Sequence, residues 1–271
     1  MNSLIKTEWL KIKNYRAFWW LLGITTLTYP GVNYIAYNIF KKITADKKEV
    51  SQMAKFLIGD PFSFPEAWHT IAYFSSFFVF IPSVIIIMFI TNEYTFKTHR
   101  QNIIDGWSRN QFMTSKLIDV AIISVIVTLL LAIIAFIIGF ITTDSGMGNM
   151  FDMIYYVALF ALQTFAQLSL AFMVGFLVRK AFISLGIFLF YFMILEPVLT
   201  KIKYLKSFDL GRFFPISISN NLIPVPAFVG NFSKEAYEKS IADIGFYIFL
   251  TILLTTAVWF LCYRLNNRRD L

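Results

Sequence analysis

One stretch of this chain decides its fold: VAIISVIVTLLLAIIAFIIGFITT, residues 120–143. Its 24 residues contain no Asp, Glu, Lys or Arg, and a charged residue stands at each end, Asp119 before it and Asp144 after it. A helix needs roughly 20 mostly apolar residues to cross the hydrocarbon core of a bilayer. The stretch therefore predicts a membrane-spanning helix at about 120–142.

Five further charge-free stretches lie before and after it. They hold 24, 26, 26, 15 and 20 residues, and the 15-residue one is long enough only if it carries Glu196 with it and continues to about Thr200. We therefore predict an all-α integral membrane protein, a single transmembrane domain over residues 1–271 with an N-terminal amphipathic interfacial helix and an outer helical segment between spans five and six. The six predicted transmembrane helices lie at about 17–40, 68–92, 120–142, 153–178, 181–200 and 243–264.

The composition agrees with a membrane protein. Hydrophobic residues make up 58% of the chain and charged residues 15%, whereas soluble proteins have about 25% charged residues. The single cysteine, Cys262, excludes an internal disulfide and a cysteine-based metal site. The net charge of +8 comes without a basic stripe interleaved with aromatic residues. We therefore expect the basic residues to meet anionic lipid headgroups at the span ends, and expect no nucleic-acid partner.

Signals for catalysis are absent from the sequence. It has no H-E-x-x-H and no G-x-S-x-G motif, and no glycine precedes a lysine, so it contains no Walker A loop to hold ATP phosphates. Among Asp, Glu, Lys, Arg and His, only Glu196 falls inside a predicted span away from its edges. We therefore expect no catalytic, cofactor-binding or metal-binding residue, and no enzyme activity of the chain by itself.

The Lys and Arg residues near the span ends predict the orientation in the membrane. With the N-terminus inside, the cytoplasmic segments hold 13 basic residues, whereas the longer outer segments hold 11. The outer loop at 143–152 decides the matter, because it contains Asp144 and Asp152 and no basic residue. Both termini are therefore predicted to be cytoplasmic, and residues 199–242 to lie outside.

The residues ahead of the first span predict a short amphipathic helix at the membrane surface. Apolar residues recur at helical spacing on one face, with lysines opposite: Ile5, Trp9 and Ile12 against Lys6 and Lys13. Glu8 projects toward the apolar side, where a helix that merely lies on lipid does not favour a carboxylate. Two interpretations stay open for Glu8, a pair with Lys11 along the helix or a contact with another protein at the cytoplasmic face.

The polar segment between spans two and three is the most informative one. From Asn92 to Lys116 it reads NEYTFKTHRQNIIDGWSRNQFMTSK, and it mixes apolar residues with basic ones. It is too long for a turn between adjacent helices and too short for a domain. It is either a solvated loop with an interfacial helix, or a short helix that presents a partly apolar surface to a partner.

This segment resembles the cytoplasmic connection between spans two and three in export-type permeases of the ATP-binding-cassette (ABC) family, the ABC-2-like group. The matching residues are Glu93, Tyr94, Thr98, Arg100, Ser108, Arg109 and Lys116. Lys97 stands where that family usually has a glycine before the threonine, and Asp105-Gly106-Trp107 replaces its usual turn with proline. Glu8 and Lys11 ahead of span one also resemble the family's amphipathic entry helix, and the predicted N-terminal interfacial helix includes Glu8, Trp9 and Lys11.

The resemblance implies a permease subunit in a bacterial cytoplasmic (inner) membrane. Two copies, or this chain with a related permease, would form a dimer and dock on a separate cytoplasmic ATPase subunit, which carries the ATP and Mg. Trp107 and Phe112 are expected to insert into a groove on the ATPase. Arg100 and Arg109 are expected to pair with carboxylates at its rim or to fix the helix to the span ends. Glu93, at the membrane boundary, is expected to orient the segment 93–116. The predicted coupling set is Glu93, Tyr94, Thr98, Arg100, Trp107, Arg109, Phe112 and Lys116.

The sequence also indicates a class of cargo and leaves two roles open for Glu196. The aromatic-rich spans favour export of an amphiphile, such as an antimicrobial peptide or a lipid-like molecule. Glu196 either pairs with Lys201 or Lys203 at the interface, or faces the dimer axis as part of an outer gate. The alternative functions are a stand-alone channel or secondary transporter, which needs ionisable residues at mid-membrane or paired repeats, and a membrane scaffold, which leaves 93–116 unexplained.

Overall fold

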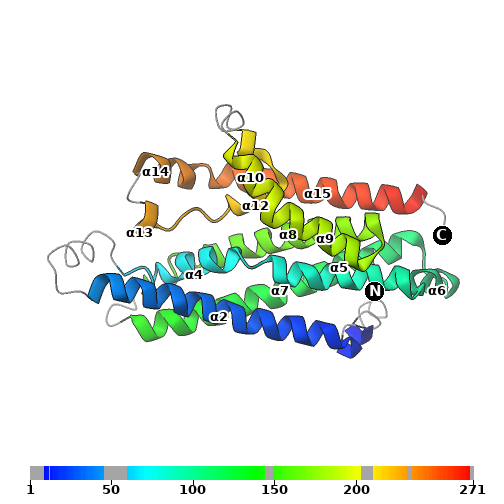
Figure 1. The fold of residues 1–271 in the computed structure, drawn as a ribbon, viewed down its shortest axis with the longest axis horizontal. Coiled ribbons are helices and arrows are strands. Elements are labelled where there is room, and N and C mark those ends of the chain that lie inside the picture. The colour runs from blue at the N-terminus through cyan, green and yellow to red at the C-terminus, as the bar shows by residue number, and fades with distance from the viewer. Residues whose placement is uncertain are drawn as a thin grey trace.

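The computed structural model describes residues 9–11, 13–45, 60–143, 149–202, 210–230 and 234–268. Within these ranges the regular secondary structure is helical and contains no strand, as the sequence predicted. The long helices run along one common direction (Figure 1). They are α2 (Arg16–Ala45), the pair α4 (Ala67–Ser76) and α5 (Phe80–Thr95), α7 (Arg109–Thr142), α8 (Tyr155–Val178), α9 (Ala181–Phe190) with its continuation to Lys201, and α15 (Ile244–Arg268).

Among the described residues, four helices are long and apolar enough to cross a membrane. They are α7, α8, the continuous helix Ala181–Lys201 and α15, and the bent pair α4 and α5 makes a fifth if it counts as one span. The predicted spans three to six are therefore found. α2 has 30 residues, about 45 Å of helix, but it is not among the helices that are apolar enough. The six-span count is not confirmed.

The second predicted span is broken, not continuous. α4 and α5 meet at an angle of 50° across residues 77–79. Pro82 has no N–H to donate to the carbonyl of Phe78, and its ring crowds that carbonyl. Serine hydroxyls donate hydrogen bonds to backbone carbonyls on both sides of the break. Ser76 Oγ donates to the carbonyl of Tyr73 at 2.7 Å, and Ser83 Oγ donates to the carbonyl of Val79 at 2.9 Å. The prediction of a single helix over 68–92 was wrong at this point. Hydropathy does not register a missing proline N–H or serine hydroxyls that bond to the backbone carbonyls of the helix.

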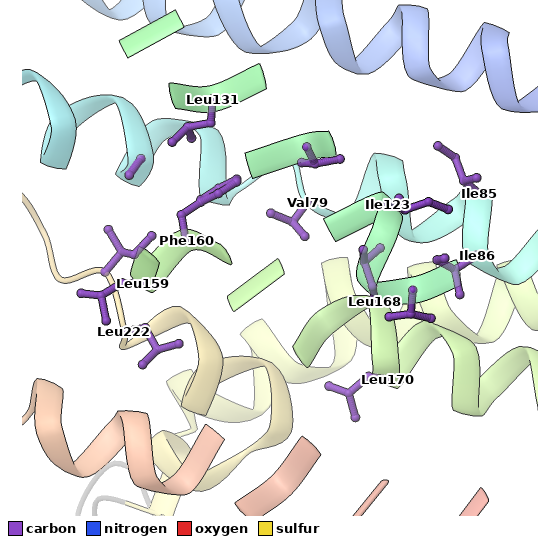
Figure 2. Close-up of a cluster of buried hydrophobic side chains, with 14 of the residues drawn as sticks. Val79, Ile85, Ile86, Ile123, Leu131, Leu159, Phe160, Leu168, Leu170 and Leu222 are labelled. Carbon is purple, nitrogen blue, oxygen red and sulfur yellow. The ribbon is translucent and has the colours of Figure 1, made fainter. Parts of the chain in front are cut away.

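α8 lies at the centre of the bundle and packs against α4, α5, α7, α9 and α15. Figure 2 shows the apolar side chains that meet there, drawn from α5, α7, α8 and the segments beside the break and after α12 (Pro215–Asn220). Gly175 of α8 permits a close approach to α5, because a Cβ atom on it would lie 2.5 Å from the Cγ2 atom of Ile90. Small residues at such contacts let membrane helices pack backbone to backbone.

Polar side chains join the helices across the apolar core. Asn33 of α2 donates to the hydroxyl of Ser75 in α4 at 3.0 Å, and Trp259 of α15 donates to that of Ser169 in α8 at 2.9 Å. Such interhelical hydrogen bonds add to van der Waals packing where lipid replaces water. The Asn33 contact ties α2 into the bundle even though α2 is the least apolar of the long helices.

The two ends of the bundle differ in what they carry (Figure 1). The α6 end holds α6 (Thr98–Ile104), the start of α2 and the end of α15. The α14 end holds α13 (Ala227–Gly230) and α14 (Lys234–Ala242), and the short helices α10 (Glu196–Lys201) and α12 belong to the same connection between the last two long helices. The predicted helical segment between spans five and six is therefore present.

Candidate functional site

The connection between α5 and α7 folds as a compact elbow around α6. Lys97, at the start of α6, has a left-handed backbone with φ 56°, and Gly106, after α6, has φ 96°. Glycine adopts this region at no steric cost, whereas other residues adopt it rarely. Lys97 stands where the sequence resemblance leads us to expect a glycine, and its backbone has the left-handed conformation that a glycine favours. The departure noted in the sequence therefore leaves a sharp turn in place.

α7 begins earlier than the membrane span predicted from hydropathy. Ser108 accepts a hydrogen bond from the backbone N–H of Gln111 at 3.2 Å, and the Gln111 side chain accepts one from the N–H of Ser108 at 2.8 Å. This reciprocal capping box fixes the first turn of a helix. The helix therefore starts at Arg109 and carries the end of the elbow directly into the bundle.

Glu93 lies between two lysines from distant parts of the chain. Its Oε1 atom is 3.1 Å from Lys11 Nζ, ahead of α2, and 2.7 Å from Lys116 Nζ in α7. Lys116 also contacts Asp119 Oδ2 at 3.2 Å. The side chains of Glu93, Lys116 and Asp119 are each less than a tenth exposed. Charges this deeply buried persist in folded proteins when they are paired, so this ionic cluster holds the N-terminal segment, α5 and α7 together.

A cavity of about 200 Å³ lies beside this cluster and is lined by Tyr15, Phe89 and Asn92 together with the charged side chains. Glu93 Oε2 is buried and has no hydrogen-bond partner among the described residues. Within the described residues, no group of three or more His, Cys, Asp or Glu side chains lies together to hold a metal ion. Glu93, Lys116 and Lys11 form an ionic joint between helices.

Arg109 fixes the start of α7 to the end of α15. Its guanidinium donates to the carbonyls of Asn266 at 3.3 Å and Asn267 at 3.0 Å, and Asn266 donates back to the Arg109 carbonyl at 3.0 Å. The last carbonyls of a helix have no partner within it and attract a cation. These contacts match one of the two roles expected for Arg109, fixing the elbow to a span end, and its pairing with a partner's carboxylates stays a prediction. Asn266 and Asn267 were not anticipated, because their spacing from Arg109 along the chain carries no signal.

The remaining elbow residues support its fold. The side chains of Thr98 and His99 both reach the carbonyl of Glu93, at 3.5 and 3.0 Å. The Arg179 guanidinium lies 4.6 Å from the centre of the Tyr94 ring, which links the elbow to the turn between α8 and α9. Arg100 is exposed.

The apolar residues of the elbow divide into buried and exposed ones. Phe112 is 2% exposed and belongs to the core, so the expectation that it inserts into a partner's groove was wrong. Its place in the first turn of α7, one turn before Lys116, turns it inward. Trp107 is partly buried, with Lys11 Nζ 5.7 Å from its ring centre. Phe96 and Ile104 are 72% and 78% exposed, and the sequence had not singled them out as anchors.

The N-terminal segment is described only in part. Trp9 and Lys11 are helical, and Trp9 is exposed while Lys11 reaches Glu93. Glu8 lies outside the described residues, so both interpretations of its role stay open. The predicted interfacial helix is likewise not confirmed, although Trp9 and Leu10 do present exposed apolar side chains beside the elbow.

Glu196 lies away from the elbow, in α10, and is 2% exposed. Its carboxylate accepts hydrogen bonds from the backbone N–H groups of Ile216 and Ser217 and from the Ser217 hydroxyl. Unsatisfied N–H groups at a helix start attract a carboxylate, and Glu196 caps α12 in this way. The expected ion pair with Lys201 is not found among the described residues, where Lys201 is exposed, and the pair with Lys203 stays a prediction because Lys203 lies outside them. A gating role stays a prediction and would act through α12.

The fold and the elbow define a class: a multi-pass helical membrane protein in which two spans are joined at one end by a short helix, α6, held beside an ionic joint. The sequence model of a family described as "ABC-2 family transporter protein" matches residues 4–195. This is well over half of the chain, and the protein belongs to that family. A comparison with curated proteins found no match. The match includes the whole elbow and ends just before Glu196.

Proposed function

We propose that this chain is the permease subunit of an ABC exporter, and that a separate cytoplasmic ATPase docks on its α6 end. Membership of the ABC-2 family supports a membrane permease. The observation that carries the proposal is the ionic joint of Lys11, Glu93 and Lys116 behind an exposed apolar elbow. A loop that only connects two spans needs neither feature.

The docking surface is formed by the exposed apolar residues of the α6 end. Phe96, which follows the last residue of α5, and Ile104, the last residue of α6, are both exposed, and Trp9 and Leu10 add apolar surface from the N-terminal segment. Large apolar side chains at the centre of an interface dominate its binding energy. Arg100 and Lys97, both exposed, stand beside them and suit a partner with carboxylates at its rim.

The contacts of the elbow connect it to several helices, so that a displacement of α6 is transmitted to the bundle. Arg109 ties it to α15, Arg179 ties it to the turn after α8, and Glu93 ties it to the segment before α2. ATP binding at the partner supplies the free-energy difference that shifts a two-state equilibrium. With these ties, motion of α6 moves several helices together and rocks the bundle between inward and outward access.

The topology of the proposal has six spans, with α2 as the first, both termini at the cytoplasmic α6 end and α14 outside. α2 supports this through its length and its hydrogen bond to α4. Two copies, or this chain with a related permease, form the complete transporter in the bacterial inner membrane. The cargo is an amphiphile, in keeping with spans that are rich in aromatic residues.

Docking is tested with the complex purified from membranes of the host through a tag on this chain. We expect an ATPase subunit with a Walker A loop to co-purify, and its ATPase rate to rise when the permease is bound. Ile104→Asp and Phe96→Asp should weaken that association by at least tenfold, since each places a charge in an apolar interface. Lys234→Ala, on α14 at the opposite end, is the control. The proposal fails if the α6 variants bind the ATPase as Lys234→Ala does.

A further inference from the structure

A second, larger cavity lies at the α14 end of the bundle. Its volume is about 670 Å³, within the range of small-molecule sites in proteins. It lies between α4, the segment from α12 to α13, α14 and the start of α15. Most of the residues around it come from beyond residue 195, where the family match ends.

The break between α4 and α5 opens onto this cavity. Tyr73, Ser76 and Phe77, which lead into the break, line its wall. Non-helical backbone within a membrane-spanning segment is tolerated where it is buried in protein or lines a hydrated cavity. Discontinuous helices also form the binding sites of many transporters. The broken span and the cavity are therefore two independent observations that point to the same place.

The charged groups around the cavity favour an anion. Arg212, before α12, and Lys239, of α14, face it from different elements, whereas Asp243 is the one carboxylate on its wall among the described residues. A cationic rim with an excess of hydrogen-bond donors suits phosphate or carboxylate oxygens.

Neutral donors add to these charges. Gln163 and Gln167 of α8 both donate to Asn220 Oδ1, at 2.9 Å each. Asn220 also lines the cavity, and its amide carries two N–H donors besides the oxygen that accepts these bonds. Burial raises the pKa of Tyr237 in α14, so its hydroxyl stays protonated and can also donate.

The remaining wall is apolar. Phe77, Ile223, Val225 and Val229 line the cavity with hydrocarbon, and Val225 and Val229 are partly exposed at its rim. A site with a cationic, donor-rich part beside an apolar part matches a molecule that has an anionic head and a hydrocarbon tail.

We propose that the cavity at the α14 end binds an anionic amphiphile, with the head held between Lys239, Arg212 and Asn220 and the tail against Phe77 and Val229. Two sources share this chemistry, a phospholipid of the surrounding leaflet and an amphiphile in transit through the transporter. The site does not depend on the docking of an ATPase.

The test is a titration of the purified full-length chain in dodecyl maltoside with phosphatidylglycerol that carries a fluorophore on its tail, followed by anisotropy. We expect saturable binding, at least tenfold tighter than for phosphatidylcholine with the same label. Lys239→Gln should weaken phosphatidylglycerol binding about tenfold, the worth of one charged hydrogen bond. Asp243→Asn should tighten it severalfold, because it removes a like charge. Val229→Trp should weaken the binding of both lipids by filling the cavity.

Lys234→Gln is the matched control, because Lys234 lies on the same helix and does not line the cavity. Size-exclusion profiles and melting temperatures of each variant establish that it is folded, and Lys239→Gln is expected to leave folding intact because Lys239 is exposed. Equal affinity for the two lipids, or equal effects of Lys239→Gln and Lys234→Gln, would overturn the proposal.

Reconstitution with the ATPase subunit distinguishes the two sources. If the amphiphile is cargo, ATP moves labelled phosphatidylglycerol between leaflets, and Lys239→Gln slows this movement. If it is a resident lipid, binding persists and ATP moves no label. Either result upholds the site, and a failure of docking at the α6 end leaves the binding titration unaffected.

Discussion

Lys116→Met removes one charge from the buried ionic cluster and keeps most of the side-chain stem. In the folded protein Lys116 Nζ lies 2.7 Å from Glu93 and 3.2 Å from Asp119, and its side chain is 4% exposed. The substitution leaves two carboxylates that are each less than a tenth exposed near one another. Lys11 still compensates part of their charge, at 3.1 Å from Glu93.

Breaking a buried ion pair by removing one partner costs about 3 to 5 kcal/mol. We take about 3 kcal/mol here, at the lower end, because Lys11 stays in place and is itself a third exposed. That is roughly 150-fold in the unfolding equilibrium. The triple variant Lys116→Met, Glu93→Gln, Asp119→Asn removes the two carboxylate charges as well, and it should recover most of the loss.

The assay is reversible unfolding in mixed micelles by titration with sodium dodecyl sulfate, read by tryptophan fluorescence. Lys180→Met is the control, since Lys180 is an exposed lysine in the turn between α8 and α9. Lys116→Met should shift the unfolding midpoint strongly and Lys180→Met hardly at all. The reasoning is refuted if the two single variants unfold alike, or if the triple variant is no more stable than Lys116→Met.

Three further predictions follow from single contacts. Gly175→Leu should destabilise the protein by about 1 to 3 kcal/mol, because its Cβ would lie 2.5 Å from Ile90, whereas Gly186→Leu, with nothing within 4 Å of its Cβ, should leave the thermal midpoint unchanged; equal midpoints would contradict the α5–α8 packing. Arg109→Ala should free the last carbonyls of α15 and speed hydrogen exchange in its final turn about fivefold, for a loss of about 1 kcal/mol, and an equal effect of Arg100→Ala would argue against this role. Burial raises the pKa of Glu66, so the protonated carboxyl group favours folding; this stabilisation is full at low pH and is lost as the pH rises through the raised pKa. Glu66→Gln should therefore be more stable than the wild type at neutral pH and equal to it below about pH 4, whereas the exposed Glu235→Gln should show no such difference. A higher stability of Glu66→Gln at every pH would refute burial of the carboxylate as the cause.

The apolar stretches predicted most of the long helices correctly. Four of the six appear as helices that can cross a membrane, because length and hydropathy determine such helices almost alone. α2 shows where this signal weakens. Polar residues such as Asn33 lower its mean hydropathy. Inside the bundle, Asn33 makes a hydrogen bond to Ser75 of α4, so a residue that weakens the hydropathy signal contributes to the packing of the helix.

The elbow was located from the sequence, but its inner arrangement was not. The pair of Lys11 and Glu93 joins residues far apart in the chain, and no local pattern encodes such a contact. A usable signal did exist for Phe112. Phe112, Lys116, Asp119 and Ile123 recur at helical spacing, and the structure buries all four. With the capping box at Ser108, this spacing marks an inward face of α7 and not an anchor for a partner.

The two candidate sites are connected by α5. At one end of α5, Glu93 is held in the ionic cluster and the chain turns at Lys97 into the exposed surface of α6. At the other end, 16 residues or about 24 Å of helix away, the chain breaks at 77–79 beside the cavity that Tyr73, Ser76 and Phe77 line. A helix transmits displacement along its axis, whereas a break absorbs a change of angle. Movement of α6 by an ATPase would therefore reach the α14 end at the wall of the amphiphile cavity, and this places the two proposals in one mechanism although each can fail alone.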